Sequence, residues 1–487
     1  MSLKSKTISS LAWKLLERSG SSVVGLVVQI VLARLLAPEA FGALAIMLVF
    51  VNIGNVIVQS GLNTALVQFP GVNDDDCSTV FWLSLCISVV LYVLVFLAAP
   101  VIASFYSMDE LIWPLRAMAL VLIINAYNAV QIAIVQRNLE LRKVFNATIV
   151  SVLISGTIGI GLAFWGTGLW ALVAQQLIYQ LVNCCVLALQ VSWRPRLVFS
   201  ASRAKRFFSF GWKLLASGLL DVGYQSLSDL VIGKQFSATQ LGYVSQGKRY
   251  PQALGSMLDG AIQPVMLSAV SRVQDDLSYV KRLVRRALKT SCYLIMPCMT
   301  LFALVAEPLV RLLLGEQWLP CVYFLQVYCF TQALLPIHTS NLQALNAMGR
   351  SDLFLKLELI KKSYGLVFLL VTAFVFKDIY LMIGSYLLSG IISTFVNAYP
   401  NKRVIGYPYI EQVRDITPGI VLSLISAAIA WSVSLLMLPD GITILLQTIV
   451  MAAAYLGFSK LFHVEALEYL LATGKELFAS KRNHIES

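Results

Sequence analysis

The sequence predicts an all-α integral membrane protein of about fourteen transmembrane helices, built as two parallel six-helix lobes around a central cavity plus two C-terminal helices. Its composition is the first indication, because 58% of the 487 residues are hydrophobic and 13% are charged, whereas a soluble chain carries about 25% charged residues. The second is the length of the apolar runs, roughly 20 residues, which matches a hydrocarbon core of about 30 Å. The third is an internal repeat.

The helices are predicted from apolar runs bounded by charged residues, glycine and proline. These runs are 11–36, 41–66, 79–105, 112–136, 144–165, 168–191, 207–235, 241–270, 287–314, 320–347, 354–376, 378–399, 416–438 and 441–462. They are continuously apolar and lack the two-residue alternation of barrel strands, which favours helices. The first run is too long for a signal peptide and no A-x-A site follows it, so it is predicted to remain as a helix.

Basic residues predict the orientation. Most of the 37 Lys and Arg residues fall in alternate connections, and the opposite helix ends carry only Arg34, Arg116, Lys234, Arg311 and Lys377. The positive-inside rule then places both termini in the cytoplasm. The net charge of +12 follows from this topology and from contact with anionic lipid, so no nucleic-acid partner is expected.

No enzymatic site is expected. The outer connections are short ("APEAF", "FYSMDEL", "KQFSATQ", "LPDG") and the longer inner ones lack a carboxylate pair arranged for acid–base chemistry. The segment "GYVSQGKR" (242–249) resembles a nucleotide-binding loop, but Arg249 occupies the position of the hydroxyl that binds Mg²⁺. The three histidines lack metal-ligand spacing. His338 lies inside a span, where we expect its ring to pack and form a hydrogen bond; the alternative is that the ring gains and loses a proton as part of the function. We therefore expect no catalytic residue, no cofactor, no metal and no ATP-driven step.

The internal repeat predicts the domain organisation. "AWKLL" (12–16) recurs as "GWKLL" (211–215), and "LLAPEAFGAL" (35–44) aligns with "KQFSATQLGY" (234–243), which brings Gly42 and Gly242 to nearly corresponding positions. The predicted parts are an N-terminal lobe (1–206), a C-terminal lobe (207–415), two further helices (416–462) and a cytoplasmic tail (463–487). Because six helices return the chain to its starting side, the lobes are parallel repeats, an architecture typical of transporters.

Charged residues inside the first helix of each lobe are the candidates for the cavity. Lys14 and Arg18 lie on one polar stripe of the first helix, with Glu17 adjacent. The alternative for Lys14 and Arg18 is that their side chains extend to the membrane surface, as those of lysine and arginine near helix ends often do.

In the seventh predicted helix, Lys213 lies about 9 Å and Asp221 about 21 Å from the predicted start. Charge at such depth is costly and tends to face a cavity. Lys213 therefore joins Lys14 and Arg18 as a candidate substrate-binding residue. Lys248 and Arg249, near the outer part of the eighth predicted helix, are further candidates for which the depth argument does not decide. Glu17, Asp221 and Asp229 are candidate ion-coupling residues. A structural salt bridge is the alternative for each.

A cavity that carries Lys and Arg suits an anionic substrate such as a diphosphate or an acidic sugar. Polar residues in the spans either contact sugar hydroxyls or, as we expect, connect helices; they are Asn52, Asn55, Asn125, Tyr127, Asn128, Gln131, Gln343 and Asn346. The segment 276–289 has a basic and an apolar side and is predicted to lie as an amphipathic helix on the inner membrane surface, either as an anchor or to gather anionic lipid-linked substrate.

Several stretches resemble a known family. These are the opening "LKSKTISSLAWKLLERSG…VLARLLAPEAFG", "SDLVIGKQFSATQLGYVSQGKRYP" (228–251), "SRVQDD" (271–276) and "LGEQW" (314–318). Over nearly the whole chain they are similar to Wzx-type polysaccharide flippases, particularly the colanic-acid exporter group. That group belongs to the superfamily of the lipid II flippases and multidrug cation antiporters.

The resemblance implies a transporter in the bacterial cytoplasmic (inner) membrane that flips undecaprenyl-diphosphate-linked oligosaccharide outward by alternating access, for polysaccharide or lipopolysaccharide assembly. It implies coupling to an H⁺ or Na⁺ gradient, and a polysaccharide polymerase and glycosyltransferases as partners beside membrane lipid. Two alternatives remain. An ion-coupled multidrug antiporter would concentrate acidic residues in its cavity, and a non-transporting scaffold of a glycan-assembly complex would not need buried charge.

Overall fold

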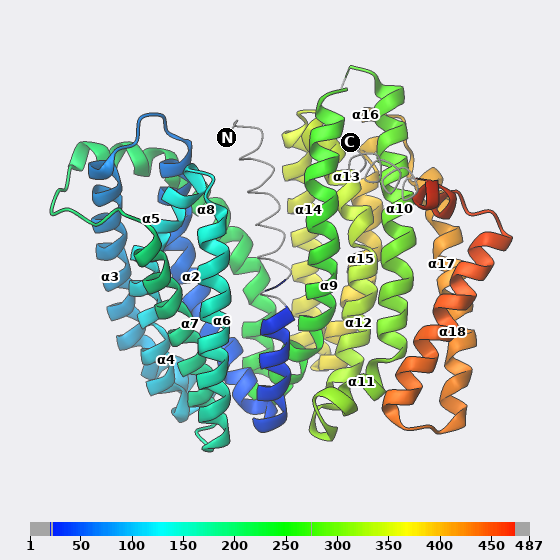
Figure 1. Ribbon diagram of the computed structural model, residues 1–487, viewed down its shortest axis with the longest axis horizontal. Helices are drawn as coiled ribbons and strands as arrows, with labels where there is room; N and C mark the ends of the chain where they lie inside the picture. Colours follow the sequence, from blue (N-terminus) through cyan, green and yellow to red (C-terminus); the bar gives the residue numbers. More distant parts are fainter. Residues whose placement is uncertain (1–19, 21–22, 274, 473–487) are drawn as a thin grey trace, which may run out of the picture. The chain divides into compact units, whose positions relative to one another are not determined.

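The computed structural model describes residues 20, 23–273 and 275–472, apart from the side chains of residues 60, 258–265, 267 and 268 (Figure 1). In this part of the chain the elements are helices, and no strand occurs. The main helices are α2 (Pro38–Gln68), α3 (Asp74–Tyr106), α4 (Ile112–Met118), α5 (Leu120–Arg137), α6 (Leu141–Phe164), α7 (Leu169–Gln190), α8 (Ala201–Gln235), α9 (Ala238–Ser271), α10 (Leu277–Leu304), α11 (Ala306–Leu313), α12 (Cys321–Ala333), α13 (Leu335–Ala347), α14 (Ser351–Leu370), α15 (Ile379–Ala398), α16 (Asn401–Val404), α17 (Tyr409–Trp431) and α18 (Asp440–Leu461).

The chain divides into two compact units, residues 1–245 and 246–487, with the division inside α9. In the first unit α2 packs against α3, α5 and α8, and α6 packs against α7. In the second unit α10 packs against α12, α13 and α17, while α18 packs against α17. Figure 1 shows α17 and α18, in orange and red, as a pair of long neighbouring helices.

Eleven of the described helical segments are long and apolar enough to cross a membrane. A shorter apolar helix, Val23–Leu35, precedes them, while α8 and α9 are long enough (35 and 34 residues) but are not among the eleven. The predicted fold class, an all-α multi-pass membrane protein, is confirmed, and the number fourteen stays a prediction. The two long helices outside the eleven are those that carry Lys213, Asp221, Asp229, Lys248 and Arg249.

Four helices begin five or more residues before their predicted starts: α3, α8, α10 (277 instead of 287) and α17 (409 instead of 416). For α3 and α8, polar caps explain the difference. Helix α3 begins at Asp74 instead of 79, because the Asn73 side chain accepts a hydrogen bond from Asp76 N and the Asp76 side chain accepts one from Asn73 N. Helix α8 begins at Ala201 instead of 207, behind a Ser200 cap. Lys213 therefore lies about 18 Å from the start of the helix, compared with the predicted distance of about 9 Å.

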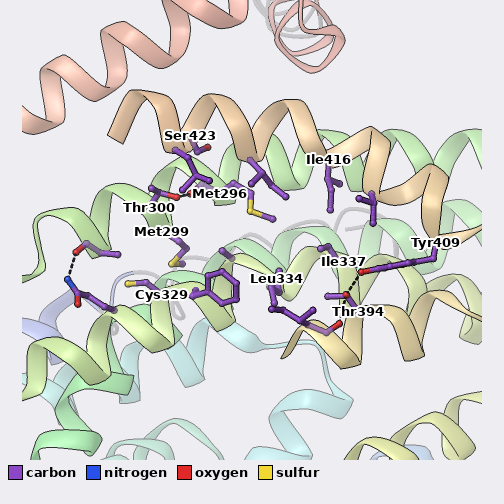
Figure 2. Close-up of a pocket in the computed structure, with 18 residues that line it drawn as sticks. Met296, Met299, Thr300, Cys329, Leu334, Ile337, Thr394, Tyr409, Ile416 and Ser423 are labelled. Atoms are coloured by element: carbon purple, nitrogen blue, oxygen red, sulfur yellow. Dashed lines mark hydrogen bonds between the residues drawn. The ribbon is translucent and has the colours of Figure 1, made fainter. Parts of the chain in front are cut away.

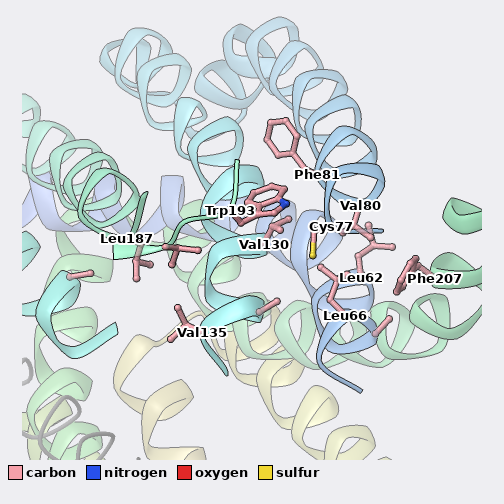
Figure 3. Close-up of a cluster of buried hydrophobic side chains, with 14 residues drawn as sticks. Leu62, Leu66, Cys77, Val80, Phe81, Val130, Val135, Leu187, Trp193 and Phe207 are labelled. Atoms are coloured by element: carbon pink, nitrogen blue, oxygen red, sulfur yellow. The ribbon is translucent and has the colours of Figure 1, made fainter. Parts of the chain in front are cut away.

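A buried apolar cluster holds the first turns of α8 in the first unit (Figure 3). Figure 3 shows Phe207 of α8 beside Leu62 and Leu66 of α2, and Phe81 beside Trp193. Phe207 is fully buried, and its ring centroid lies 5.3 Å from that of Phe69. Burying an aromatic side chain contributes about 2–3 kcal/mol, so this contact holds the first turns of α8 against the end of α2.

Helix α2 crosses α8 and the start of α9 with backbone against backbone. A Cβ atom built on Gly61 would lie 2.5 Å from the Gly211 carbonyl oxygen of α8. At the other end of α2, a Cβ on Gly42 would lie 1.7 Å from the Ala238 carbonyl oxygen, and one on Gly242 would lie 2.0 Å from the Pro38 carbonyl oxygen. Only glycine permits such approaches, as in the small-residue contacts of other membrane helices.

We predict that Gly61→Ala lowers the free energy of unfolding by about 1–3 kcal/mol, because the added methyl group forces α2 and α8 apart. Thermal unfolding in detergent measures the effect. The matched control is Gly223→Ala in α8, where a Cβ meets no atom within 4 Å and the higher helix propensity of alanine should raise stability slightly. Equal Tm values for the two variants would contradict the crossing.

Candidate functional site

The structure places the predicted site residues in three groups. Lys14, Glu17 and Arg18 lie outside the described residues. Lys213, Asp221 and Asp229 lie on α8 in the first unit, and Lys248 and Arg249 lie on α9 in the second.

The α8 residues form a polar stripe that the fold leaves exposed. Lys213, Ser217, Asp221 and Gln225, each four residues from the next, are all exposed. Asp221 Oδ2 accepts a hydrogen bond of 2.8 Å from Gln225 Nε2, and Asp229 is half-buried one turn further on. An ammonium group and a carboxylate about 12 Å apart along one helix can bind an anion and a cation at separate points.

Helix α9 carries Lys248 and Arg249 beside a close contact with α12. A Cβ on Gly247 would lie 2.8 Å from Phe324 Cβ, and one on Gly255 would lie 2.2 Å from Gln332 Oε1. These glycines mark the face of α9 that packs on α12, and Arg249 lies two residues from Gly247, on the opposite side of the helix. Both basic side chains are half-buried. The segment "GYVSQGKR" is helical throughout, so it does not form a phosphate-binding loop.

The starts of α3 and α8 are joined by a charged cluster that the sequence reading missed. Buried Asp76 lies 3.3 Å from Arg206 Nη2 and 3.7 Å from Arg203 Nε. Asp75 lies 3.5 Å from Arg203 Nη1, and Asp74 lies 3.2 Å from Arg196 Nη2. The run of three aspartates in the sequence was the available signal, but partners more than 110 residues away are found only in the folded chain.

Polar residues in the spans connect helices, as predicted for several of them. Asn125 Nδ2 donates to Asn55 Oδ1 at 2.9 Å, which joins α5 to α2. Asn128 Nδ2 donates to Asn183 Oδ1 at 3.1 Å, which joins α5 to α7. The amide of buried Gln131 is assigned with its nitrogen toward the Cys184 carbonyl at 3.2 Å, and in this orientation its oxygen accepts a hydrogen bond from the Tyr127 hydroxyl at 3.2 Å.

In the second unit, a buried amide network connects the middle of α13 to the starts of α16 and α17. Asn341 Oδ1 accepts hydrogen bonds from Asn401 Nδ2 at 2.6 Å and from Gln412 Nε2 at 3.0 Å. His338 Nδ1 lies 3.0 Å from Asn397 Nδ2, which agrees with its expected packing role. These amides therefore hold helices together within their own unit.

The segment 276–289 is not a separate helix on the membrane surface, contrary to the sequence prediction, because residues 277–289 form the first turns of α10. Three of its five basic residues pair with carboxylates of α17. Lys281 lies 2.7 Å from Glu411, and Arg285 lies 2.6 Å from Asp415. Lys289 lies 3.3 Å from Asp415 and 2.6 Å from Glu465. These pairs hold the segment against α17, more than 100 residues away in sequence.

The Lys289 ammonium lowers the pKa of the Glu465 carboxyl through its hydrogen bond. A lowered carboxyl pKa means that the pair contributes stability above the ordinary pKa of glutamate and that this contribution is lost as the pH falls through the lowered value. The contribution is small, because the Glu465 side chain is 78% exposed and solvent screens the pair.

An apolar pocket of about 470 Å³ lies among α10, α12, α13, α15 and α17 (Figure 2). Met296 and Met299 of α10 and Ile416 of α17 line it, and Figure 2 shows Tyr409 and Thr394 hydrogen-bonded at one end, at 3.0 Å. Such a lining suits a hydrocarbon group and not a sugar. The sequence reading did not find this pocket, because its residues are spread over five helices.

Known proteins share both the sequence pattern and the fold. The model of a family described as polysaccharide biosynthesis protein matches residues 31–323. The succinoglycan biosynthesis transport protein ExoT of Rhizobium meliloti is 26% identical over 65% of this chain and 64% of its own length. The lipopolysaccharide biosynthesis protein WzxC of Escherichia coli is 23% identical over 90% of this chain and 89% of its own.

Among solved structures, the lipid II flippase MurJ in an inward closed conformation superposes with a TM-score of 0.77, covering 94% of this chain and 100% of MurJ at 14% identity. An inward-facing multidrug resistance transporter of the MATE family superposes with a TM-score of 0.56, over 85% of this chain and 98% of its own, at 15% identity. These similarities concern the fold.

The fold and the distribution of charge thus define a multi-pass helical membrane protein with the architecture of the flippases and antiporters. Because the family model matches more than half of its length, the chain belongs to the polysaccharide biosynthesis protein family. The predicted resemblance to Wzx-type polysaccharide flippases is confirmed.

We predict that Asp76→Ala lowers the free energy of unfolding by about 2–4 kcal/mol, because it removes a helix cap and leaves Arg203 and Arg206 without their most buried partner. Thermal or denaturant unfolding in detergent measures the loss. Asp75→Ala is the control, since its side chain is 36% exposed and an exposed pair contributes about 0–1 kcal/mol. If both variants lose the same stability, Asp76 does not hold the two helix starts together.

Proposed function

We propose that the protein flips undecaprenyl-diphosphate-linked oligosaccharide from the inner to the outer leaflet of the bacterial cytoplasmic membrane, for polysaccharide export. The observation that carries the proposal is the similarity to WzxC along 90% of the chain. The fold shared with a lipid II flippase supports it. The protein acts as a transporter and not as an enzyme in this proposal, since substrate and product differ only in the leaflet they occupy.

Residues on α8 are proposed to contact the substrate. A diphosphate carries negative charge and strong acceptor oxygens, to which an ammonium group donates charge-assisted hydrogen bonds. Lys213 is exposed within a long helix that is less apolar than the other spans, and charge there is retained only where it faces water, substrate or a partner. We assign Lys14, Arg18, Lys248 and Arg249 to the same class of candidates, and Asp221, Asp229 and Glu17 to ion coupling by H⁺ or Na⁺.

Contacts at the starts of α2 and α9 support the two-lobe repeat (1–206 and 207–415). Gly42 packs on the Ala238 carbonyl and Gly242 packs on the Pro38 carbonyl. The contact is reciprocal at a constant sequence offset, as expected where two repeats meet at a local two-fold axis. In our proposal the lobes rock about such contacts and give alternating access, and helices 416–462 with the tail 463–487 are additions to the second lobe.

The positive-inside pattern supports a topology with both termini in the cytoplasm. A polymerase and glycosyltransferases that make and consume the lipid-linked glycan are the proposed partners.

In sealed proteoliposomes with lipid-linked oligosaccharide on one side, we predict that Lys213→Gln slows translocation about tenfold to a hundredfold, which corresponds to one charge-assisted hydrogen bond of about 1.5–3 kcal/mol. The loss should occur with and without an imposed ion gradient. Lys205→Gln is the matched control, because Lys205 is an exposed lysine two turns nearer the start of the same helix. Unchanged translocation in the Lys213 variant would remove it from the substrate path.

We predict that Asp221→Asn retains slow translocation without a gradient but loses acceleration by H⁺ or Na⁺, because an amide cannot release a proton or neutralise a cation. Rates at matched and opposed gradients measure this, with exposed Asp109→Asn as the control. If the Asp221→Asn variant still responds to the gradient, Asp221 is not the coupling residue, and Asp229 and Glu17 are the remaining candidates. Export of cationic dyes without glycan movement would instead identify an antiporter.

The proposed topology predicts that a thiol at Asp109→Cys reacts with a membrane-impermeant reagent added to intact spheroplasts. A thiol at Arg350→Cys should react only after the membrane is permeabilised. Both residues are charged and exposed, so the substitutions disturb no core, and the native protein gives the background of its eight cysteines. The reverse labelling pattern would invert the orientation.

A further inference from the structure

Two neighbouring pockets lie in the second unit, where α10 meets the chain that follows α18. The first, the basic pocket, has a volume of about 540 Å³. Four basic side chains and two carboxylates are among the residues that line it: Arg282, Arg285, Arg286, Lys289, Glu465 and Glu468. The second lies beside it and is distinct from the pocket of Figure 2; in this subsection it is called the apolar pocket. It has a volume of about 500 Å³ and shares Lys289, Glu465 and Ala466 with the basic pocket.

The charges of the basic pocket are only partly balanced. Arg285 and Lys289 pair with Asp415, and Lys289 also pairs with Glu465. Arg282 and Arg286 are exposed, and within the described parts of the chain neither forms an ion pair with a carboxylate. Two positive charges one helical turn apart are therefore available to an anion.

Aromatic rings hold these two arginines in place. The Arg286 guanidinium carbon lies 4.8 Å from the ring centroid of Tyr469, and that of Arg282 lies 5.3 Å from the ring centroid of Tyr279. Such contacts stabilise a guanidinium group without neutralising it. The side chains are thus ordered while their donors remain available to phosphate oxygens, which arginine binds in a bidentate manner.

The neighbouring pocket determines what kind of anion fits. Ile416, Leu422 and Ile425 of α17 line it together with Phe462 and Val464, and Phe462 is 65% exposed at the end of α18. A free phosphate would use the arginines and leave this surface uncovered. A molecule with a phosphate at one end and hydrocarbon at the other would use both pockets.

We propose that the two pockets bind one anionic phospholipid, with its headgroup phosphate at Arg282 and Arg286 and part of an acyl chain in the apolar pocket. The inference goes beyond the proposed transport function, because α10, α17 and residues 464–472 carry none of the proposed transport residues. Anionic phospholipid is abundant in the leaflet that faces clustered lysine and arginine, and basic pockets at the ends of membrane helices bind such headgroups.

Native mass spectrometry of the purified full-length protein in detergent tests the proposal, with phosphatidylglycerol and phosphatidylcholine as probes. We expect phosphatidylglycerol to bind in preference, and the double variant Arg282→Gln/Arg286→Gln to bind it about tenfold or more weakly. The matched control is Lys402→Gln/Arg403→Gln, which removes two exposed charges elsewhere in the same unit and should leave binding unchanged. Equal effects of the two double variants, or equal binding of the two lipids, would overturn the proposal.

Further probes separate a phospholipid from other phosphates. Ile425→Trp, at a position 43% exposed, fills the apolar pocket and should weaken phosphatidylglycerol binding while circular dichroism and elution volume stay unchanged. Glycerol phosphate, which lacks the chain, should bind much more weakly than phosphatidylglycerol. Glycerol phosphate binding as tightly would overturn the acyl-chain site, and a preference for undecaprenyl diphosphate would overturn the assignment to phospholipid. Because these measurements do not depend on transport, a result that overturns the lipid site does not affect the proposed function.

Discussion

The close crossing of α2 with α8 and the start of α9 is the constraint on which the first unit depends. At Gly61 and Gly211 and again at Gly42 and Gly242, backbone meets backbone at distances that leave no room for a Cβ. Without a hydrophobic driving force between helices inside a membrane, such contacts depend on close van der Waals packing. The crossing fixes the course of α8, and with it the face on which Lys213 and Asp221 are exposed.

Charge follows two patterns along the chain. Where helix starts meet, carboxylates and arginines are paired, as at Asp76 with Arg206 and at Asp415 with Arg285. These pairs connect α3 to α8 and α10 to α17, so their role is structural. Lys213 and the pair Arg282 and Arg286 differ, because they are exposed and no carboxylate within the described residues pairs with them. Exposed cations of this kind are suited to anionic ligands.

Polar residues inside the spans illustrate why residue type alone does not identify a binding site. Asn125, Asn128 and Gln131 all suit sugar hydroxyls by their chemistry, yet they hydrogen-bond to α2 and α7. A polar group in a membrane must find a partner, and a neighbouring helix supplies one. Residues that remain exposed after these contacts are made, such as those of the α8 stripe, are better candidates for ligand contact.

The sequence by itself determined the fold class, most helix positions and the family resemblance. The length of an apolar run and the charge of a connection are local properties of the sequence, and the thickness and charge of the membrane impose them directly. It also indicated Lys213 and Asp221, since charge within a long span is visible without coordinates. Tertiary structure alone decided that residues 277–289 continue into α10, that Asp76 and Asp415 have arginine partners, and that apolar and basic pockets lie side by side near Lys289. The ion pairs and the pockets join segments 100 or more residues apart, and no local pattern encodes which distant segments pack together.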